Sequence, residues 1–304
     1  MALPIAHAWC EHYSGQRLIA VIDPSLEVLL RRANLPLEIW VVSKKERERL
    51  AQLLKIHRPS TAFIMTNSLG SLWPYFKSRV PQRIGFGGKL TRYLLTQRGC
   101  RSLLSLPQGE RWFSLLKLEA QSSKIPYLIQ SQRSLNHLPQ LLVFPGAKYG
   151  PAKQWDMASY AEFIGCCQQK GWEVILMGTP AEKEDAEKIQ QYLKQPVKNL
   201  CGSLNISALL DYISTLPRPV VLANDSGAMH LLAACGVPTL GLYFSTSARN
   251  TPPAFGPYRV LEAQVPCRPC YARQCPYQHY QCRAALRPNI AMAVMEDFLR
   301  EHSL

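Results

Sequence analysis

The chain has 304 residues and a formal net charge of +14; 47% of its residues are hydrophobic and 18% are charged. This composition excludes a disordered chain and suits a globular protein long enough for two domains. No stretch reaches the roughly 18 uncharged apolar residues of a membrane-spanning helix, and the first residues lack the features of a signal peptide. We therefore expect a cytoplasmic protein. Lys and Arg are spread along the chain, which argues against nucleic-acid binding. Two explanations of the positive charge remain open. The protein could be attracted to an anionic membrane face or a phosphorylated lipid, or it could come from a generally basic proteome.

Short apolar runs alternate with amphipathic stretches along the chain, which predicts alternating strands and helices. The predicted strands are 17–23, 37–42, 61–65, 83–86, 141–144, 173–177, 220–223 and 239–243. The predicted helices are 43–56, 157–169, 182–193, 206–214 and 226–235, with Asp156 and Asn205 as N-caps and Gly171 as a C-cap. Such alternation predicts α/β domains with parallel sheets covered on both faces. The polar stretch 130–140 predicts a linker between an N-terminal domain, residues 1–135, and a C-terminal domain, residues 136–304.

The strongest local signal is VVLANDSGAMHLLAAC, residues 220–235. A buried strand runs through Asp225, Ser226 and Gly227 directly into an apolar helix, whose free N–H groups form a ready anion site. Ligands of open α/β sheets bind at the carboxyl ends of the strands, where this turn lies. His230 follows Ser226 by four residues and shares its helix face. Alternatively, the same residues form an ordinary N-cap and a core histidine.

A second signal is FPGAKYGPAKQW, residues 144–155, which also follows a predicted strand. Its small residues Gly146, Ala147 and Gly150 let the backbone approach a ligand closely. Lys148 and Lys153 add positive charge at the strand end, which suits a diphosphate leaving group. Taken alone, the segment also fits a surface loop with solvated lysines.

Together these two segments, with NDSGAMHLLAACGVPTLGLYFSTS and the earlier TNSLGSLWPYFKSRVPQRIGFGGKLTRYLLT, resemble the ADP-heptose:lipopolysaccharide heptosyltransferases. The likeness covers nearly the whole chain and is nearest to the heptosyltransferase II branch. It implies the GT-B fold, in which two Rossmann-like, doubly wound domains face a cleft. It also implies inverting transfer of heptose from ADP-heptose to the inner core of lipopolysaccharide, with no cofactor required.

Residue roles follow from the resemblance alone. Lys153 would contact the donor phosphates and stabilise the leaving group, and the rest of the donor pocket would be lined by Asp225, Ser226, Gly227 and His230. Glu182 would bind the ribose. On the acceptor side we expect Asn67, Arg83 and Arg92, because inner-core phosphates or acidic sugars favour bidentate arginines. The expected partners are ADP-heptose and the lipid A/inner-core acceptor, with peripheral contact at the cytoplasmic face of the inner membrane and no nucleic acid.

The chain departs from the family at its beginning. Family members start with a strand and a loop that carries the catalytic Asp, whereas MALPIAHAWCEHYSG resembles the first helix already under way. Loss of that central strand leaves two neighbouring strands without ladder partners. Three explanations of this beginning are ranked here. We favour a start codon assigned too late, and next an inactive relative that only binds the nucleotide sugar. The third is an enzyme that uses His7, His12 or Asp23 as its base. A transferase for another nucleotide sugar on the same fold is a further alternative.

Four of the ten cysteines lie in PCRPCYARQCPYQHYQC, residues 266–282. This chain without an export signal is not expected to rely on disulfides. The segment offers the ligand types and number for tetrahedral zinc, although its spacing matches no familiar zinc finger. The candidate ligands are Cys267, Cys270, Cys275, His279 and Cys282. A structural loop of buried thiols is the alternative.

Overall fold

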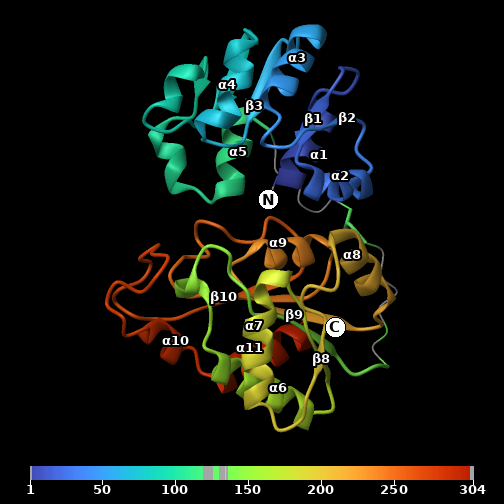
Figure 1. Ribbon diagram of the computed structural model, residues 1–304, viewed down its shortest axis with the longest axis vertical. Coiled ribbons are helices and arrows are strands. Elements are labelled where there is room, and N and C mark those ends of the chain that lie inside the picture. The colour runs from blue at the N-terminus through green and yellow to red at the C-terminus, as the bar shows by residue number, and fades with distance from the viewer. Residues whose placement is uncertain (1, 119–125, 130–133, 135, 302–304) are drawn as a thin grey trace. The chain divides into compact units, whose positions relative to one another are not determined.

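The structure, a computed structural model, describes residues 2–118, 126–129, 134 and 136–301 (Figure 1). The chain divides into two compact units, which we call unit 1, Met1–Ile125, and unit 2, Pro126–Leu304. The boundary lies ten residues before the predicted one at 135. The predicted linker 130–140 lies partly outside the described residues. Leu128 belongs to unit 2, because its backbone N–H donates to Ala234 O at 3.0 Å.

Unit 2 is built on one six-stranded parallel sheet. Its order is β11-β10-β9-β6-β7-β8, so β6, the first of these strands in the chain, lies near the middle. The strands are β6 (Gln140–Phe144), β7 (Glu173–Leu176), β8 (Lys198–Asn199), β9 (Pro219–Asn224), β10 (Thr239–Tyr243) and β11 (Tyr258–Glu262). This is the doubly wound arrangement predicted from the alternating pattern.

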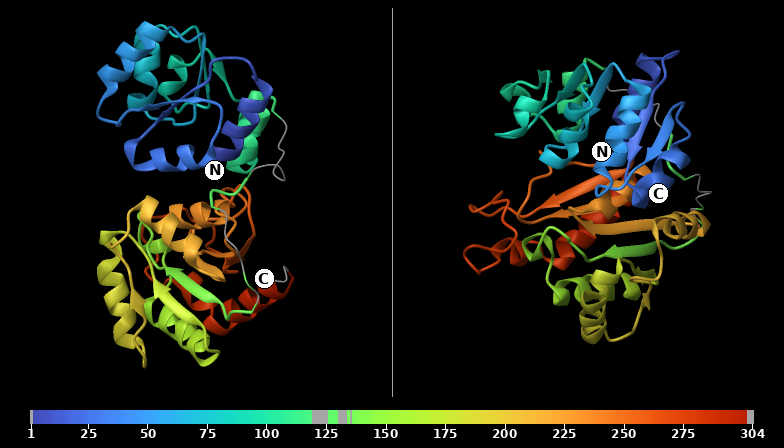
Figure 2. Two further views of the ribbon diagram at one scale, coloured as in Figure 1. Left: turned by 90° about the vertical axis from the view of Figure 1, so that its right-hand side faces the viewer. Right: turned by 45° about the horizontal axis from the view of Figure 1, so that its top comes forward.

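Helices cover both faces of this sheet (Figure 2). One layer holds α6 (Met157–Gln169), α7 (Lys183–Tyr192) and α11 (Pro288–Glu301), and α6 packs against both of the others. The opposite layer holds α8 (Ile206–Thr215) and α9 (Gly227–Ala234), with the short α10 (Gln281–Ala285) at one end of the unit.

The predicted helix ends are confirmed. The Asp156 carboxylate accepts from Ser159 N at 2.8 Å, and the Asn205 side chain accepts from Ala208 N at 2.9 Å. Gly171 takes a φ of 76°, a left-handed conformation that suits glycine.

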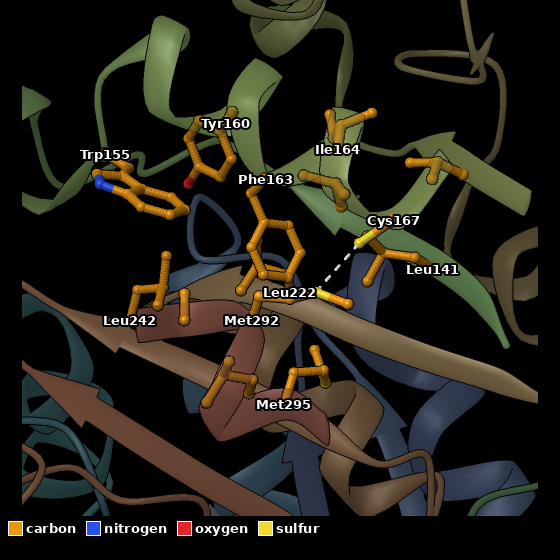
Figure 3. Packing of buried hydrophobic residues seen from close by; sticks show 14 of the residues in the cluster. Leu141, Trp155, Tyr160, Phe163, Ile164, Cys167, Leu222, Leu242, Met292 and Met295 are labelled. Atoms are coloured by element: carbon orange, nitrogen blue, oxygen red, sulfur yellow. Dashed lines mark hydrogen bonds between the residues drawn. The ribbon is translucent and has the colours of Figure 1, made fainter. Parts of the chain in front are cut away.

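The core of unit 2 lies between the sheet and the α6–α11 layer (Figure 3). Phe163 and Met295 are fully buried there, and the indole N–H of the fully buried Trp155 donates to Leu286 O at 3.0 Å. Sulfur and aromatic groups fill the space between the helices, as Figure 3 shows for Cys167 and Met292.

Unit 1 differs because its strands form two separate parallel sheets, β1-β2 and β3-β4-β5. The strands are β1 (Ile19–Ile22), β2 (Glu38–Val41), β3 (Thr61–Ile64), β4 (Gln82–Gly85) and β5 (Gln97–Arg98). The helices are α1 (Ala2–His12), α2 (Glu27–Ala33), α3 (Arg47–His57), α4 (Leu69–Lys77) and α5 (Gln108–Leu116). In the described residues, β1 and β3 each have one ladder partner, which agrees with the predicted pair of strands lacking a common neighbour.

Two smaller cores serve unit 1. One, around Trp40, Leu54 and Leu72, packs α3 and α4 against the strands, and the other joins α1 to α5 through Ile5 and Trp112. Across the described part of the chain, no helix is both long and apolar enough to cross a membrane.

Candidate functional site

Four neighbouring strands of unit 2, β7, β6, β9 and β10, end along the same edge of the sheet because all of them are parallel. Each strand end leads into a turn of small or polar residues. In sheet order, these turns begin at Met177, Pro145, Asp225 and Phe244. The two motifs singled out in the sequence therefore lie on adjacent strands, β6 and β9, and we call this edge the unit 2 site.

The centre of the unit 2 site is an ion pair between Lys153 and Asp225. Lys153 ends a 3-10 helix, Pro151–Lys153, and its Nζ lies 2.5 Å from Asp225 Oδ2 and 3.3 Å from the Asp225 carbonyl oxygen. Both side chains are largely buried, with 14% and 5% of their surface exposed. A buried charge requires a partner, so the lysine is held in place beside the start of α9.

Asp225 is itself positioned by groups on the neighbouring strand. The Thr246 hydroxyl, just after β10, donates to Asp225 Oδ2 at 2.7 Å, and the Asp225 N–H donates to Leu242 O at 3.0 Å. Hydrogen bonds to a charged acceptor are the stronger kind. The carboxylate is therefore fixed from two sides, by Lys153 and by Thr246.

Asn224 ties the two site turns together. Its side-chain N–H groups donate to Pro145 O at 2.7 Å and Gly146 O at 3.2 Å, and its Oδ1 accepts from the Tyr160 hydroxyl at 2.7 Å. All of these bonds are buried, where an unmade hydrogen bond would be costly. The turn after β6 is thereby held against the turn after β9.

The start of α9 faces open space beside the ion pair. Ser226 is the N-cap residue, and within the described residues it makes no side-chain capping bond and its buried Oγ has no partner. Apart from its chain neighbours and the backbone of α9, no atom of the described residues lies within 4 Å of where a Cβ on Gly227 would stand. Free N–H groups, an unpartnered hydroxyl and room for a ligand make this helix start suitable for an anion.

His230 lies one turn into α9, with Nε2 4.0 Å from Asp225 Oδ1. Its Nδ1 is buried and has no hydrogen-bond partner in the part of the chain that the structure describes. Burial lowers the pKa of His230 to about 4, and the nearby Lys153 acts in the same direction against the opposing effect of Asp225. The imidazole is therefore neutral at physiological pH and offers a hydrogen bond without adding charge.

Glu182 reaches the same edge from the turn after β7. A Cβ on Gly146 would stand 2.2 Å from Glu182 Oε1, so a larger residue there would displace the Glu182 side chain. The carboxylate also accepts from the Thr179 N–H and hydroxyl, which forms a capping box. The structure thus brings Glu182 to the site, with a helix-capping role besides any role in binding.

Comparison with known proteins identifies the family of this chain. The family model for glycosyltransferase family 9 (heptosyltransferase) matches residues 47–281. The chain belongs to glycosyltransferase family 9.

Similar individual proteins are heptosyltransferases. Lipooligosaccharide heptosyltransferase 2 of Campylobacter jejuni is 29% identical over 197 residues, which cover 62% of this chain and 61% of that protein. Lipopolysaccharide heptosyltransferase 2 of Salmonella typhimurium is 29% identical over 255 residues, covering 75% of this chain and 72% of that protein. The solved structure of E. coli ADP-heptose LPS heptosyltransferase II shares 21% identity with a TM-score of 0.77 and covers 100% of this chain and 95% of that chain. This structural likeness confirms the predicted GT-B fold.

The residues predicted for the acceptor side of this family 9 chain lie in unit 1, and their surroundings differ from one residue to the next. Arg83 donates to the carbonyl oxygens of Leu94 at 2.7 Å and Val80 at 2.5 Å, so its guanidinium braces the local backbone. Arg92 is exposed and stacks over the Tyr93 ring at 4.7 Å. The Asn67 side chain is exposed, and the backbone carbonyl oxygen of Asn67 accepts from Thr91 Oγ1 at 3.1 Å. Bidentate acceptor binding remains a prediction and fits Arg92 better than Arg83.

The predicted metal ligands lie in a loop that packs against the turn carrying Lys153. Cys267, Cys270, Cys275, His279 and Cys282 line one small cavity. No three metal-ligating side chains among the described residues are placed closely enough to hold an ion. The described residues therefore do not form a preformed metal centre.

Sequence reasoning missed Asn224, Thr246 and Tyr160 as residues that hold the site together. Asn224 and Thr246 follow apolar strand runs that end at the same sheet edge. That position is the signal by which they could have been found. Tyr160 lies on α6, and its partner is 64 residues away in the sequence, so no local pattern identifies it.

Proposed function

We propose that this family 9 chain transfers heptose from ADP-heptose to the inner core of lipopolysaccharide, with inversion at the transferred carbon. The observation that carries this proposal is the unit 2 site, where Lys153, Asp225 and the open start of α9 meet at one sheet edge. The names of the similar proteins, lipopolysaccharide heptosyltransferase 2 and ADP-heptose LPS heptosyltransferase II, support the choice of donor and acceptor.

The donor diphosphate would bind between Lys153 and the first N–H groups of α9. In the transfer, an acceptor hydroxyl attacks C1 of the heptose and loses its proton to water, the C1–O bond to the diphosphate breaks, and ADP leaves with additional negative charge. A fixed lysine and a helix start neutralise that charge without reorganising. The neutral His230 and the unpartnered Ser226 hydroxyl would donate hydrogen bonds to phosphate or sugar oxygens.

Glu182 would complete the donor site by accepting hydrogen bonds from the ribose hydroxyls. Its carboxylate lies beside Gly146 and Gly178, at the carboxyl ends of β6 and β7. On the acceptor side, Asn67 and Arg92 are the exposed polar side chains suited to phosphates or acidic sugars of the inner core. The acceptor is a lipid, and the net charge of +14 would favour peripheral binding at the anionic cytoplasmic face of the inner membrane.

The donor role is tested by titrating ADP into the wild-type protein and into the variant Lys153→Ala. Loss of a hydrogen bond to a charged group predicts that ADP binding weakens by about 1.5–3 kcal/mol. Lys148→Ala is the matched control, because Lys148 is an exposed lysine five residues away on the same turn. Equal affinities of the Lys153→Ala and wild-type proteins for ADP, both verified as folded, would refute the phosphate role.

Competition among nucleotides tests the choice of donor. ADP should displace ADP-heptose more strongly than UDP or GDP does, since the proposal assigns an adenine nucleotide to the site. A preference for UDP or GDP would favour the predicted alternative, a transferase for another nucleotide sugar on the same fold.

A further inference from the structure

Lys153 carries its ammonium at the end of a long, flexible stem, so a diphosphate meets it in a fixed position only if other groups restrain it. Nζ donates to Asp225 Oδ2 at 2.5 Å and to the Asp225 carbonyl oxygen at 3.3 Å. These bonds use two of the three N–H groups of the ammonium. The carboxylate restrains the ammonium, but it also offsets the positive charge that attracts a diphosphate.

A second contact of the Lys153 ammonium is with the aromatic ring of Tyr149. Nζ lies over this ring, 5.0 Å from its centroid, which is within the roughly 6 Å over which a ring face attracts a cation. The lysine side chain is only 14% exposed, and a cation–π contact is stronger where water is excluded. Because a ring face carries no net charge, Tyr149 restrains the ammonium without neutralising it.

The Tyr149 ring is held in turn by the loop that joins β11 to α10. The Tyr149 hydroxyl donates to Tyr271 O at 2.7 Å, and the Arg273 guanidinium lies over the same ring, 5.3 Å from its centroid. Tyr271 is itself anchored, because its N–H donates to Ser245 O, just after β10, at 2.8 Å. The ring is therefore fixed relative to the strand ends of the unit 2 site.

The backbone between Tyr149 and Lys153 is fixed by the same loop. A Cβ on Gly150 would stand 2.5 Å from Arg273 O, so the two backbones lie directly against each other there. The Ala152 N–H donates to that oxygen at 3.0 Å. The ring and the lysine stem thus leave one short, anchored turn, which keeps the ring face beside the ammonium.

We propose that Tyr149 is a positioning residue of the donor site, whose ring face holds the Lys153 ammonium where the donor diphosphate binds. This inference rests on the proposed function, which assigns the diphosphate to Lys153. An ammonium that is already in place loses less side-chain freedom when the ligand binds. The phosphates then meet a restrained positive charge, which is the condition for stabilising a charged leaving group.

Two substitutions of Tyr149 separate its ring from its hydroxyl. Tyr149→Phe keeps the ring face and loses the bond to Tyr271, so its affinity for ADP, measured by calorimetry, should stay within about twofold of wild type. Tyr149→Leu removes the ring, and ADP should bind about fivefold more weakly, as expected for a partly desolvated cation–π contact.

The matched control is Tyr212→Leu. Lys198 Nζ lies over the Tyr212 ring at the same distance, 5.0 Å, but this pair belongs to β8 and α8 rather than to the turn that carries Lys153. The affinity for ADP should not change in this variant. Urea unfolding verifies that every variant is folded before ADP is titrated.

A double-mutant cycle with Lys153→Ala shows whether Tyr149 acts through the lysine. In the Lys153→Ala protein, Tyr149→Leu should have no further effect on ADP affinity, because the ammonium that the ring restrains is gone. A merely structural role of the ring would produce the same loss with or without the lysine.

The proposed function and this inference fail in different ways. Wild-type affinity in Tyr149→Leu, or an equal loss with and without Lys153, would overturn the positioning role while leaving donor binding intact. A loss in Tyr149→Phe as large as that in Tyr149→Leu would assign the effect to the hydroxyl and overturn the role of the ring face. Wild-type protein that does not bind ADP would refute the proposed function itself, and this inference with it.

Discussion

Units 1 and 2 share a parallel α/β plan but differ in the continuity of their sheets. In unit 2, the strand that comes first in the chain, β6, pairs with both β7 and β9, and all six residues of β9 are buried. In unit 1, β1 pairs with β2 and β3 with β4, and every residue of the apolar β1 is only partly buried. A strand without a second neighbour leaves apolar surface and backbone groups less well covered.

This difference shows why the site is assembled in unit 2. Lys153, Asp225 and Thr246 meet because their turns follow strands that are aligned at one edge of a continuous sheet. The two short sheets of unit 1 cannot align as many strand ends. We therefore expect unit 2 to carry both the donor site and the larger share of stability.

The largest expected effect separates the cores of the two units. Phe163→Ala removes a fully buried ring from unit 2 and should lower the free energy of unfolding by about 3–5 kcal/mol. Phe63→Ala is the matched change in unit 1, where the ring is partly buried against Trp9, and it should cost roughly half as much. Urea unfolding followed by hydrogen exchange in each unit measures both values. Equal losses would contradict the proposed difference in packing.

A smaller effect comes from pH. The pKa of His230 is about 4 in the folded protein and about 6.5 without the fold. The unfolded chain therefore binds more protons between these values, and the free energy of unfolding should fall as pH is lowered from about 6.5 to 4, by up to about 3 kcal/mol. His230→Gln should flatten this dependence on pH. An identical slope in wild type and variant would show that His230 is not buried in its neutral form.

The smallest effect concerns the support of Asp225. Thr246→Val removes the hydroxyl that donates to the carboxylate and should weaken ADP binding by about 0.5–1.5 kcal/mol, as expected for coupled neighbours. Thr91→Val removes a hydroxyl of equal burial, 7% exposed, from unit 1. ADP affinity, measured by calorimetry, should not change in this control. A similar loss in both variants would mean that the effect is general destabilisation.

Much of unit 2 could be predicted because its elements obey local rules. The strand 239–243 and the helix 157–169 have the predicted bounds, and the Asp156 and Asn205 caps are where the sequence places them. By contrast, α2, α4, α5, α10 and α11 were not predicted, and α4 contains Pro74, which interrupts a helical pattern. The two separate sheets of unit 1 were not predictable from periodicity, which alone would have predicted one sheet.

The charged residues of the candidate site could be predicted from the sequence. The residues that position them could not. Lys153 and Asp225 stand in turns that follow apolar strands, so their proximity follows from the parallel sheet. The bond from Tyr160 to Asn224 and the packing of the Arg273 backbone against Gly150 join residues far apart in the chain. Such contacts depend on the three-dimensional arrangement of loops, which no local pattern encodes.

The most direct test of the central claim is a transfer assay with ADP-heptose and a heptose-bearing inner-core acceptor. The proposed function predicts that ADP is released and that the acceptor gains the mass of one heptose. Lys153→Ala should slow both changes equally. Binding of ADP-heptose with neither ADP release nor a heavier acceptor would contradict the claim and identify the chain as a binding-only relative.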